Sequence, residues 1–169
     1  EGVGPKTAQA FQAMGVERPR DLLFLLPHSG IDRRRRDTIR GADLPGVVTV
    51  EVEVGIHFPP RTKGRPYRIT VHDAETEFQV VFFHARGDYL IKLLPPGARR
   101  LLSGRVELFD GLAQMVHPDH VLSPHEAADL PQFEPVYPLT AGLTQKQVVR
   151  AVGGALARAP QPEEWIDDR

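Results

Sequence analysis

Strictly alternating apolar residues occupy the middle of the chain, and they constrain its fold more than any other feature. From residue 48 to residue 54 every second residue is valine, and threonine or glutamate stands between the valines. Alternation with a period of two is typical of a β-strand with one buried and one exposed face. Further strand-like stretches follow at 67–71, 78–83, 101–109 and 112–116. Residues 46–122 are therefore predicted to form one domain of five strands.

The order of these predicted elements selects one architecture. A short helical turn at 89–94, closed by a Pro-Pro-Gly sequence, separates the third strand from the fourth. Asp110-Gly111 is a strong signal for a two-residue β-hairpin, and it joins the fourth strand to the fifth. Five strands with a helix between the third and the fourth match the OB-fold, a Greek-key barrel whose loops often hold oligonucleotides. We therefore expect a mainly β protein built on a five-stranded OB-fold Greek-key barrel.

Helical segments are predicted on both sides of this barrel. Residues 1–30 contain two short helices, each of which begins at a proline. Residues 144–169 begin with a helix, for which Thr144 is the expected N-cap and Gln147 its capping-box partner. The acidic end of this segment is expected to be a solvated linker. Two connectors complete the predicted organisation, a basic one at 31–45 and a proline-rich, extended one at 123–143.

Charge is distributed unevenly along the chain, although the net charge is only −1. Residues 31–105 carry a net charge of +5, residues 106–169 carry −6, and residues 1–30 carry none. This pattern indicates an electrostatic binding region confined to the middle of the chain. The near-neutral total argues against a tight, nonspecific nucleic-acid binder, but it is compatible with a local site for a polyanion.

Several classes of protein are excluded by what the sequence lacks. Cysteine is absent, which rules out disulfides, thiol nucleophiles and cysteine-based metal sites. No uncharged apolar run approaches the roughly 18 residues of a membrane span. The chain starts at Glu1 without a basic and then apolar leader, so we expect no signal peptide, a piece of a longer protein and a reducing cytoplasmic location. Hydrolase and nucleotide-triphosphate motifs are absent, so no cofactor and no catalysis by this chain alone are expected.

Two clusters of basic residues are candidate contacts to a nucleic-acid backbone. The first is a run of four arginines, and its alternative interpretation is a solvated surface run flanked by Asp32 and Asp37. The second lies on the predicted loop between the first two strands and just beyond it, which borders the binding face of an OB-fold. The first cluster comprises Arg33, Arg34, Arg35 and Arg36, and the second Arg61, Lys63, Arg65 and Arg68.

A Gly-x-Gly turn at Gly2 and Gly4 opens the first predicted helix, and Lys6 follows it. Backbone N–H groups at a helix N-terminus can hold a phosphate, and Lys6 would add positive charge to such a site. The stretch resembles half of a helix-hairpin-helix element, which binds nucleic-acid backbones. The alternative is that the glycines and Pro5 merely shape the start of a helix.

Aromatic residues surround the polar loop 84–88. Phe82 and Phe83 precede this loop, and Tyr89 follows it. Consecutive residues of a strand point to opposite faces, so one phenylalanine belongs to the core and the other can reach the loop edge. An exposed ring there could stack on an unpaired base for ~1–3 kcal/mol. The alternative is that all three rings are buried in the core.

Three histidines, His117, His120 and His125, are close in sequence. Pro118 and Pro124 interrupt the segment, and the histidines follow no helical or finger-like spacing. No metal site is therefore predicted.

Four stretches of the sequence carry a family resemblance. They are GVGPKTAQAF, RPRDLLFLLPHSGIDRR, VVFFHARGDYLIKLLPPGARRLLSGRVELFDGLAQMVHPDH and FEPVYPLTAGLTQKQVVRAV. In this order they resemble the N-terminal wedge region of the RecG family of bacterial DNA helicases, and they cover nearly the whole chain. The pieces VYPLTAGLTQKQ and LFDGLAQMVHP are the most specific.

The resemblance implies a role in DNA repair and recombination. RecG helicases are ATP-dependent translocases on double-stranded DNA that regress stalled replication forks and move Holliday junctions. Their wedge is an OB-fold that grips the junction and splits its arms, while a separate motor that uses ATP and Mg pulls the DNA. The motor motifs are absent here, so residues 144–169 would lead toward a motor outside this sequence.

The resemblance also implies site residues and partners. In the family an aromatic pair stacks on bases where the strands part, in a motif that runs roughly F-F-N-x-P-Y. The matching residues here are Phe83 and Tyr89, although the intervening loop is longer and lacks the Asn and the Pro. The expected partners are replication forks, Holliday junctions and single-stranded-DNA-binding protein. We expect a monomer in the bacterial cytoplasm, associated with the nucleoid.

Two other functions stay open at the level of sequence. An OB-fold can be a module for single-stranded nucleic acid or tRNA, which would show no preference for junctions. It can also be a protein-interaction domain, which would prefer a protein tail over any DNA, even at high salt.

Overall fold

The structure is a computed structural model of the 169-residue chain, and it describes residues 3–62 and 64–160. The chain divides into two compact units, one formed by Ile31–Glu134 and the other by Glu1–Gly30 together with Pro135–Arg169. The sequence predicted five consecutive segments instead. The difference arises because the two ends of the chain share one hydrophobic cluster.

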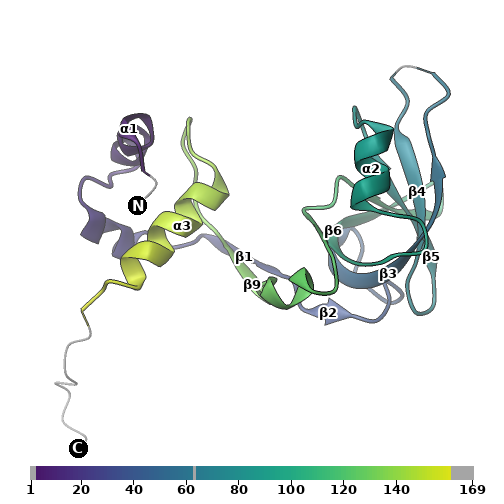
Figure 1. Ribbon diagram of the computed structural model, residues 1–169. Coiled ribbons are helices and arrows are strands. Elements are labelled where there is room, and N and C mark those ends of the chain that lie inside the picture. Colours follow the sequence, from purple (N-terminus) through teal and green to yellow (C-terminus); the bar gives the residue numbers. More distant parts are fainter. Residues whose placement is uncertain (1–2, 63, 161–169) are drawn as a thin grey trace, which may run out of the picture. The chain divides into compact units, whose positions relative to one another are not determined.

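The Ile31–Glu134 unit is built on a closed β-barrel (Figure 1). Its five strands are β3 (Gly46–Phe58), β4 (Tyr67–His72), β5 (Glu77–Phe82), β6 (Arg99–Phe109) and β7 (Leu112–Val116). The strands are hydrogen-bonded in the order β3-β4-β5-β7-β6, and an additional pairing of β3 with β6 closes the barrel. Only the β5–β7 pair is parallel among these described neighbours. The predicted fold, a mainly β protein with a five-stranded OB-type barrel, is confirmed.

The side chains of β3 show how the barrel is filled. Val50, Val52 and Val54 are buried, whereas Glu51 and Glu53 between them are exposed. The alternation in the sequence therefore predicted both faces correctly over residues 50–54. It fails at Thr49, which is buried and hydrogen-bonded to the Ser103 hydroxyl at 2.7 Å. The valines belong to a core cluster to which β4, β5, β6 and β7 all contribute. Burial of this apolar surface is the main stabilising contribution to the barrel.

The helical insert and the Asp110-Gly111 hairpin turn also form as predicted. Helix α2 (Gly87–Leu93) lies between β5 and β6 in the chain, and its Leu90 is buried in the barrel core. Asp110 and Gly111 have φ values of +48° and +78°, and Phe109 pairs with Leu112 across the turn. Positive φ at both central residues is the requirement of a type I′ hairpin turn.

The barrel is flanked by short strands, and the sequence did not predict these strands. The strand β2 (Arg35–Arg36) pairs in parallel with β3, and β8 (His120–Leu122) pairs antiparallel with β6. A 3-10 helix, η2 (Glu126–Asp129), follows β8. Strands of two or three residues are too short for an alternation pattern to reveal them.

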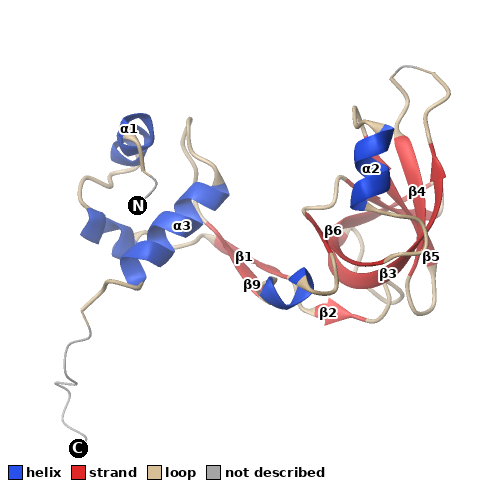
Figure 2. Ribbon diagram, viewed as in Figure 1, coloured by secondary structure: helices blue, strands red, loops and turns tan. Residues whose placement is uncertain are grey.

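The other unit is helical (Figure 2). Its elements are α1 (Pro5–Ala13), the 3-10 helix η1 (Pro19–Phe24) and α3 (Gln145–Leu156). Residues from both ends of the chain form its core, namely Phe11, Val16, Tyr137, Leu143, Val148 and Val152. The N-terminal helical pair and the C-terminal helix are thus confirmed, with the second helix of the pair in 3-10 form. No helix within 3–62 or 64–160 is long and apolar enough to cross a membrane.

The predicted start of α3 is correct in detail. The Gln147 side chain accepts a hydrogen bond from the Thr144 N–H at 2.9 Å, and the Thr144 hydroxyl accepts one from the Gln147 N–H. This reciprocal pair is a capping box. The boundary between the two units falls within β1 (Ser29–Asp32) and β9 (Phe133–Val136), which pair as a two-stranded sheet.

Candidate nucleic-acid interface

The end of β5 separates two neighbouring phenylalanines. Phe82 is 8% exposed and belongs to the barrel core, whereas Phe83 is 43% exposed. Tyr89, in the first turn of α2, is 59% exposed. The prediction that one phenylalanine is buried and the other reaches the edge is confirmed, and the alternative that all three rings lie in the core is wrong.

Phe83 and Tyr89 line one hollow of ≈ 770 Å³ at this edge of the barrel. Its other walls come from the loop between β5 and α2, from α2 and from the segment after β7, and they include Arg86, Leu93, His117 and Asp119. The strands β5 and β7 are parallel, with Val81 opposite Val116. The residues that follow both strands therefore reach the same edge, which is why residues 83 and 117 meet there.

The basic loop between β3 and β4 faces a second hollow, of ≈ 440 Å³. Arg61 and Arg65 line it together with Phe82 and His84, which also line the first hollow. The two hollows therefore adjoin at the β5–α2 loop. No described residue forms an ion pair with either arginine.

The other two members of the second basic cluster differ from Arg61 and Arg65. Arg68 lies on β4 opposite Val81 of β5 and is half-buried. Lys63 lies outside the described residues. The aromatic pair and the arginines of the β3–β4 loop thus form one region, which we call the aromatic–basic edge: Phe83, Tyr89, Arg61, Arg65 and Arg86.

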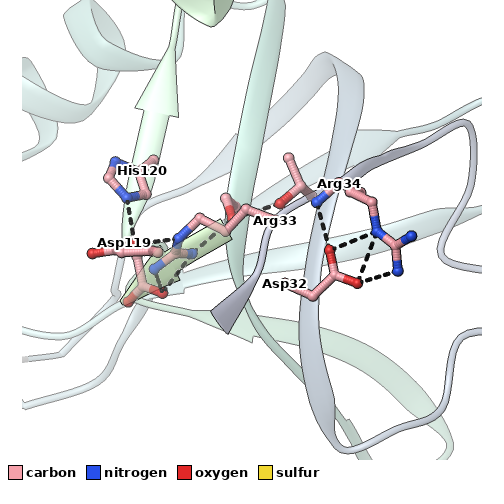
Figure 3. Close-up of polar contacts among 8 residues, drawn as sticks. Asp32, Arg33, Arg34, Asp119 and His120 are labelled. Atoms are coloured by element: carbon pink, nitrogen blue, oxygen red, sulfur yellow. Dashed lines mark hydrogen bonds and ion pairs between the residues drawn. The ribbon is translucent and has the colours of Figure 1, made fainter. Parts of the chain in front are cut away.

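Arg33 requires a correction, because the structure does not place it where DNA could contact it. Its side chain is 3% exposed. The guanidinium donates to the Ser103 hydroxyl at 2.8 Å and to the Asp119 carboxylate at 3.1 Å, and it forms an ion pair with Glu134 (Figure 3). A buried cation with these partners is a structural group, so Arg33 leaves the set of candidate phosphate contacts.

The remaining arginines of the run are exposed, and two of them have partners within the protein. Arg34 forms an ion pair with Asp32 at 2.6 Å and lies over the Phe133 ring, 5.4 Å from its centroid. Hydrogen bonds from the Arg34 side chain and backbone hold the pKa of Asp32 below its ordinary value. Arg35 donates to the Ala127 carbonyl, and Arg36 is exposed.

Lys6 is exposed in the first turn of α1. The preceding Gly4 is the N-cap of this helix and provides no side-chain cap. Lys6 belongs to the helical unit rather than to the barrel unit. A phosphate contact there stays a separate prediction.

His117 is the residue of this region whose role the sequence did not indicate. The Phe83 N–H donates to its Nε2 at 3.0 Å, and its ring meets those of Phe82 and Phe83. His117 is brought to Phe83 by the parallel pairing of β5 with β7, which the sequence alone did not specify. Within the described part of the chain, no group of three or more acidic, histidine or cysteine side chains is placed to hold a metal ion.

Comparisons with known proteins agree with this fold. A family model described as the RecG wedge domain matches residues 1–158. The ATP-dependent DNA helicase RecG of Acidithiobacillus ferridurans is 29% identical over 182 residues, which cover 99% of this chain and 25% of that protein. A solved structure of RecG bound to a three-way DNA junction matches with a TM-score of 0.71 at 22% identity, over 99% of this chain and 23% of that one.

The barrel, its helical insert and its exposed aromatic edge define the class as an OB-type domain with flanking helices. The chain belongs to the RecG wedge domain family, whose model covers nearly all of it. The resemblance found in the sequence is thereby confirmed. The chain spans about a quarter of the length of the curated relative that it matches.

Proposed function

We propose that this chain is the branched-DNA-binding wedge of a RecG-type helicase. The observation that carries the proposal is the aromatic–basic edge, where two exposed rings and three arginines gather in a domain of this family. The RecG of the solved complex is bound to a three-way DNA junction, which supports branched DNA as the ligand. Replication forks and Holliday junctions are the branched DNAs that this proposal covers.

The proposed mechanism is physical rather than chemical. Arg61, Arg65 and Arg86 hold phosphates next to the branch point, since cationic side chains supply most of the sequence-independent affinity for DNA. Phe83 and Tyr89 stack on bases at the last pair, and such stacking contributes ~1–3 kcal/mol per base. This offsets part of the few kcal/mol that are lost when a base leaves its stack.

Direction and energy for fork regression come, in this proposal, from a motor elsewhere in the parent protein. That motor would bind ATP and Mg, while this chain binds neither. We further propose that the wedge acts as a monomer in the bacterial cytoplasm at the nucleoid, where single-stranded-DNA-binding protein is a candidate partner. A preference for that protein's tail over any DNA at high salt would favour the protein-interaction alternative instead.

The test is fluorescence anisotropy of the 169-residue chain with a three-way fork, a matched duplex and a single strand, each at low and at physiological salt. We expect the fork to bind most tightly and to resist competition by duplex. Phe83→Ala should weaken fork binding by about 5-fold or more and leave duplex binding unchanged.

Phe24→Ala is the matched control, because Phe24 is an exposed phenylalanine of the helical unit, outside the aromatic–basic edge. It should leave the affinity for the fork unchanged. Equal, steeply salt-dependent binding of all three DNAs would show that only phosphates are recognised and would contradict the wedge function. Tightest binding of the single strand would favour the alternative of a single-strand or tRNA module.

A further inference from the structure

His117 has an unusual backbone conformation directly beside the aromatic–basic edge. Its φ is +45°, in the left-handed region that residues other than glycine rarely occupy. Such conformations persist only where the surrounding structure enforces them, and they gather at functional sites. The conformation turns the chain at the end of β7, where the strand would otherwise continue past Val116.

Three contacts enforce this turn. The His117 N–H donates to the Val81 carbonyl at 2.9 Å, which ties the turn to β5. Pro118 lies so close to β6 that a Cβ added at Gly104 would be 3.0 Å from the Pro118 Cα. Asp119 is held at 3.1 Å by the buried guanidinium of Arg33. The imidazole of His117 is therefore carried by a segment that is anchored at both of its ends.

The imidazole in turn holds the residue that is proposed to stack on DNA. Phe83 follows the last residue of β5, and its N–H donates to His117 Nε2 at 3.0 Å. The two ring centroids are 5.9 Å apart, and the His117 ring also meets the buried Phe82 ring edge-on at 5.7 Å. The His117 side chain thus accepts a hydrogen bond from the Phe83 backbone and contacts both the buried Phe82 ring and the exposed Phe83 ring.

We propose that His117 is the positioning residue for Phe83, and that it acts only as the neutral imidazole. Nε2 can accept the Phe83 N–H while the proton is on Nδ1, and protonation of Nε2 replaces the acceptor with a second donor. The bond at 3.0 Å is then lost and Phe83 is released. This inference rests on the proposed function, and it predicts that the preference for forks falls on acidification.

Other titratable groups line the same hollow and bear on this pH dependence. They are His84 and Arg86 of the β5–α2 loop, Tyr89 of α2 and Asp119, whose carboxylate is paired with Arg33. The β6 strand meets this segment through Gly104, which has no side chain to titrate. Carboxylates, phenols and guanidinium groups ordinarily change charge outside pH 5–8, whereas histidines change charge within it. His84 is therefore the necessary control.

The variants His117→Gln and His84→Gln form a matched pair. Both histidines line the hollow, and both have positive φ, so the backbone cost of the substitution is similar at the two sites. Glutamine at 117 keeps an oxygen that can accept the Phe83 N–H and that does not titrate. The measured quantity is the ratio of fork affinity to duplex affinity between pH 7.5 and 5.5, because this ratio cancels the general gain of positive charge at low pH.

We expect the ratio of the unsubstituted chain to fall about 5-fold on acidification, as one base stack is lost. The ratio of His84→Gln should fall equally, and that of His117→Gln should stay constant. A ratio that falls in His117→Gln as it does in the unsubstituted chain would overturn the inference. A ratio that does not change with pH in the unsubstituted chain, while Phe83→Ala still lowers it, would overturn the inference and leave the proposed function intact.

A measurement without DNA separates the two ideas further. The amide resonance of Phe83 should shift with pH in step with the ring resonances of His117, because the hydrogen bond joins the two groups. In His117→Gln this shift should disappear, and in His84→Gln it should remain. If the amide resonance of Phe83 does not follow the ring resonances of His117, the positioning role is overturned. This outcome does not depend on whether the chain prefers forks to duplex DNA.

Discussion

Two arginine-rich segments of the barrel unit are alike in sequence and different in structure. The run at 33–36 is bound into the protein at its first residue, through Ser103, Asp119 and Glu134. The loop between β3 and β4 presents Arg61 and Arg65 to a hollow that adjoins the exposed aromatic rings. The comparison teaches that the number of cations in a segment says little about which of them DNA can contact.

The difference lies in the partners of each arginine. Arg33 is buried against Ser103 and Asp119, whereas its neighbour Arg34 is exposed and pairs with Asp32, as Figure 3 shows for the two acidic partners. Strand alternation does not explain this, because Arg33 and Arg34 lie between β1 and β2, and Arg35 is exposed as well. The loop after β3 keeps both Arg61 and Arg65 exposed.

The largest effect is expected at Arg33. Arg33→Ala leaves Asp119 and Glu134 without their cation, so the free energy of unfolding should fall by about 2–3 kcal/mol. Urea unfolding at pH 7 measures this change. Arg36→Ala, at an exposed position of the same run, is the control and should alter the free energy by less than about 0.5 kcal/mol. Similar small losses in both variants would remove the distinction between the inner and the outer arginines.

The second prediction concerns the salt dependence of DNA binding. Arg61→Ala/Arg65→Ala should reduce the slope of log affinity against log salt by about 2, one unit for each lost phosphate contact. Arg34→Ala/Arg36→Ala removes the same charge from the run and should change the slope less. Titrations of the fork at several salt concentrations measure both slopes. A larger change in the second double variant would reverse the comparison.

Asp73 anchors the segment that follows the arginine run, because it accepts a hydrogen bond from Ile39 of that segment. Its carboxylate accepts hydrogen bonds from the N–H groups of Ile39 and Thr76, each at 2.7 Å. Burial acts to raise the pKa of Asp73, but hydrogen bonds from Glu75, Ile39 and Thr76 outweigh it and hold this pKa below its ordinary value. The stabilisation is therefore complete above the unfolded-state pKa, about 3.9, and is lost as the pH falls through the lower folded-state pKa.

The third prediction follows from this sign. Asp73→Asn should lower the free energy of unfolding at pH 7 by about 1–2 kcal/mol, because a charged acceptor is lost. Between pH 4 and pH 2 the variant should lose less stability than the unsubstituted chain. Urea unfolding across this range tests both statements, with Glu75→Gln in the same turn as control. If acid destabilises Asp73→Asn and the unsubstituted chain equally, Asp73 is not an anchor of this segment.

The smallest effect is expected for the exposed pair of Arg34 and Asp32. An exposed ion pair contributes little, because water screens it and both side chains lose freedom when they pair. Arg34→Ala should therefore leave the melting temperature unchanged within experimental error, in contrast to Arg33→Ala. A large loss of thermal stability would show that the contact of Arg34 with Phe133 is structural.

Local signals predicted most of the fold. The Asp110-Gly111 turn, the Thr144–Gln147 cap and the alternating valines each depend on residues that are close in sequence. The partners of Arg33 could not be predicted in this way, because Asp119 and Glu134 lie 86 and 101 residues further along the chain. The short strands β2 and β8 likewise depend on the barrel to which they pair.

The candidate site was predicted in part for the same reason. Alternation predicted that only one of Phe82 and Phe83 belongs to the core. The family resemblance, and not the alternation, selected Phe83, which is the exposed ring. The role of His117 depends on the parallel pairing of β5 with β7, which brings together residues 34 positions apart. Pairing between distant strands is set by the closed barrel and not by a local motif.

The central claim is that Phe83 stacks on a base at the branch point of a fork. The most direct measurement places 2-aminopurine at the last base pair of a three-way fork and records its fluorescence as the chain is added. Stacking by Phe83 predicts a fluorescence change that Phe83→Ala loses and that a 2-aminopurine deep in a duplex arm does not show. An identical change with Phe83→Ala, or none at the branch point at saturating protein, would contradict the account.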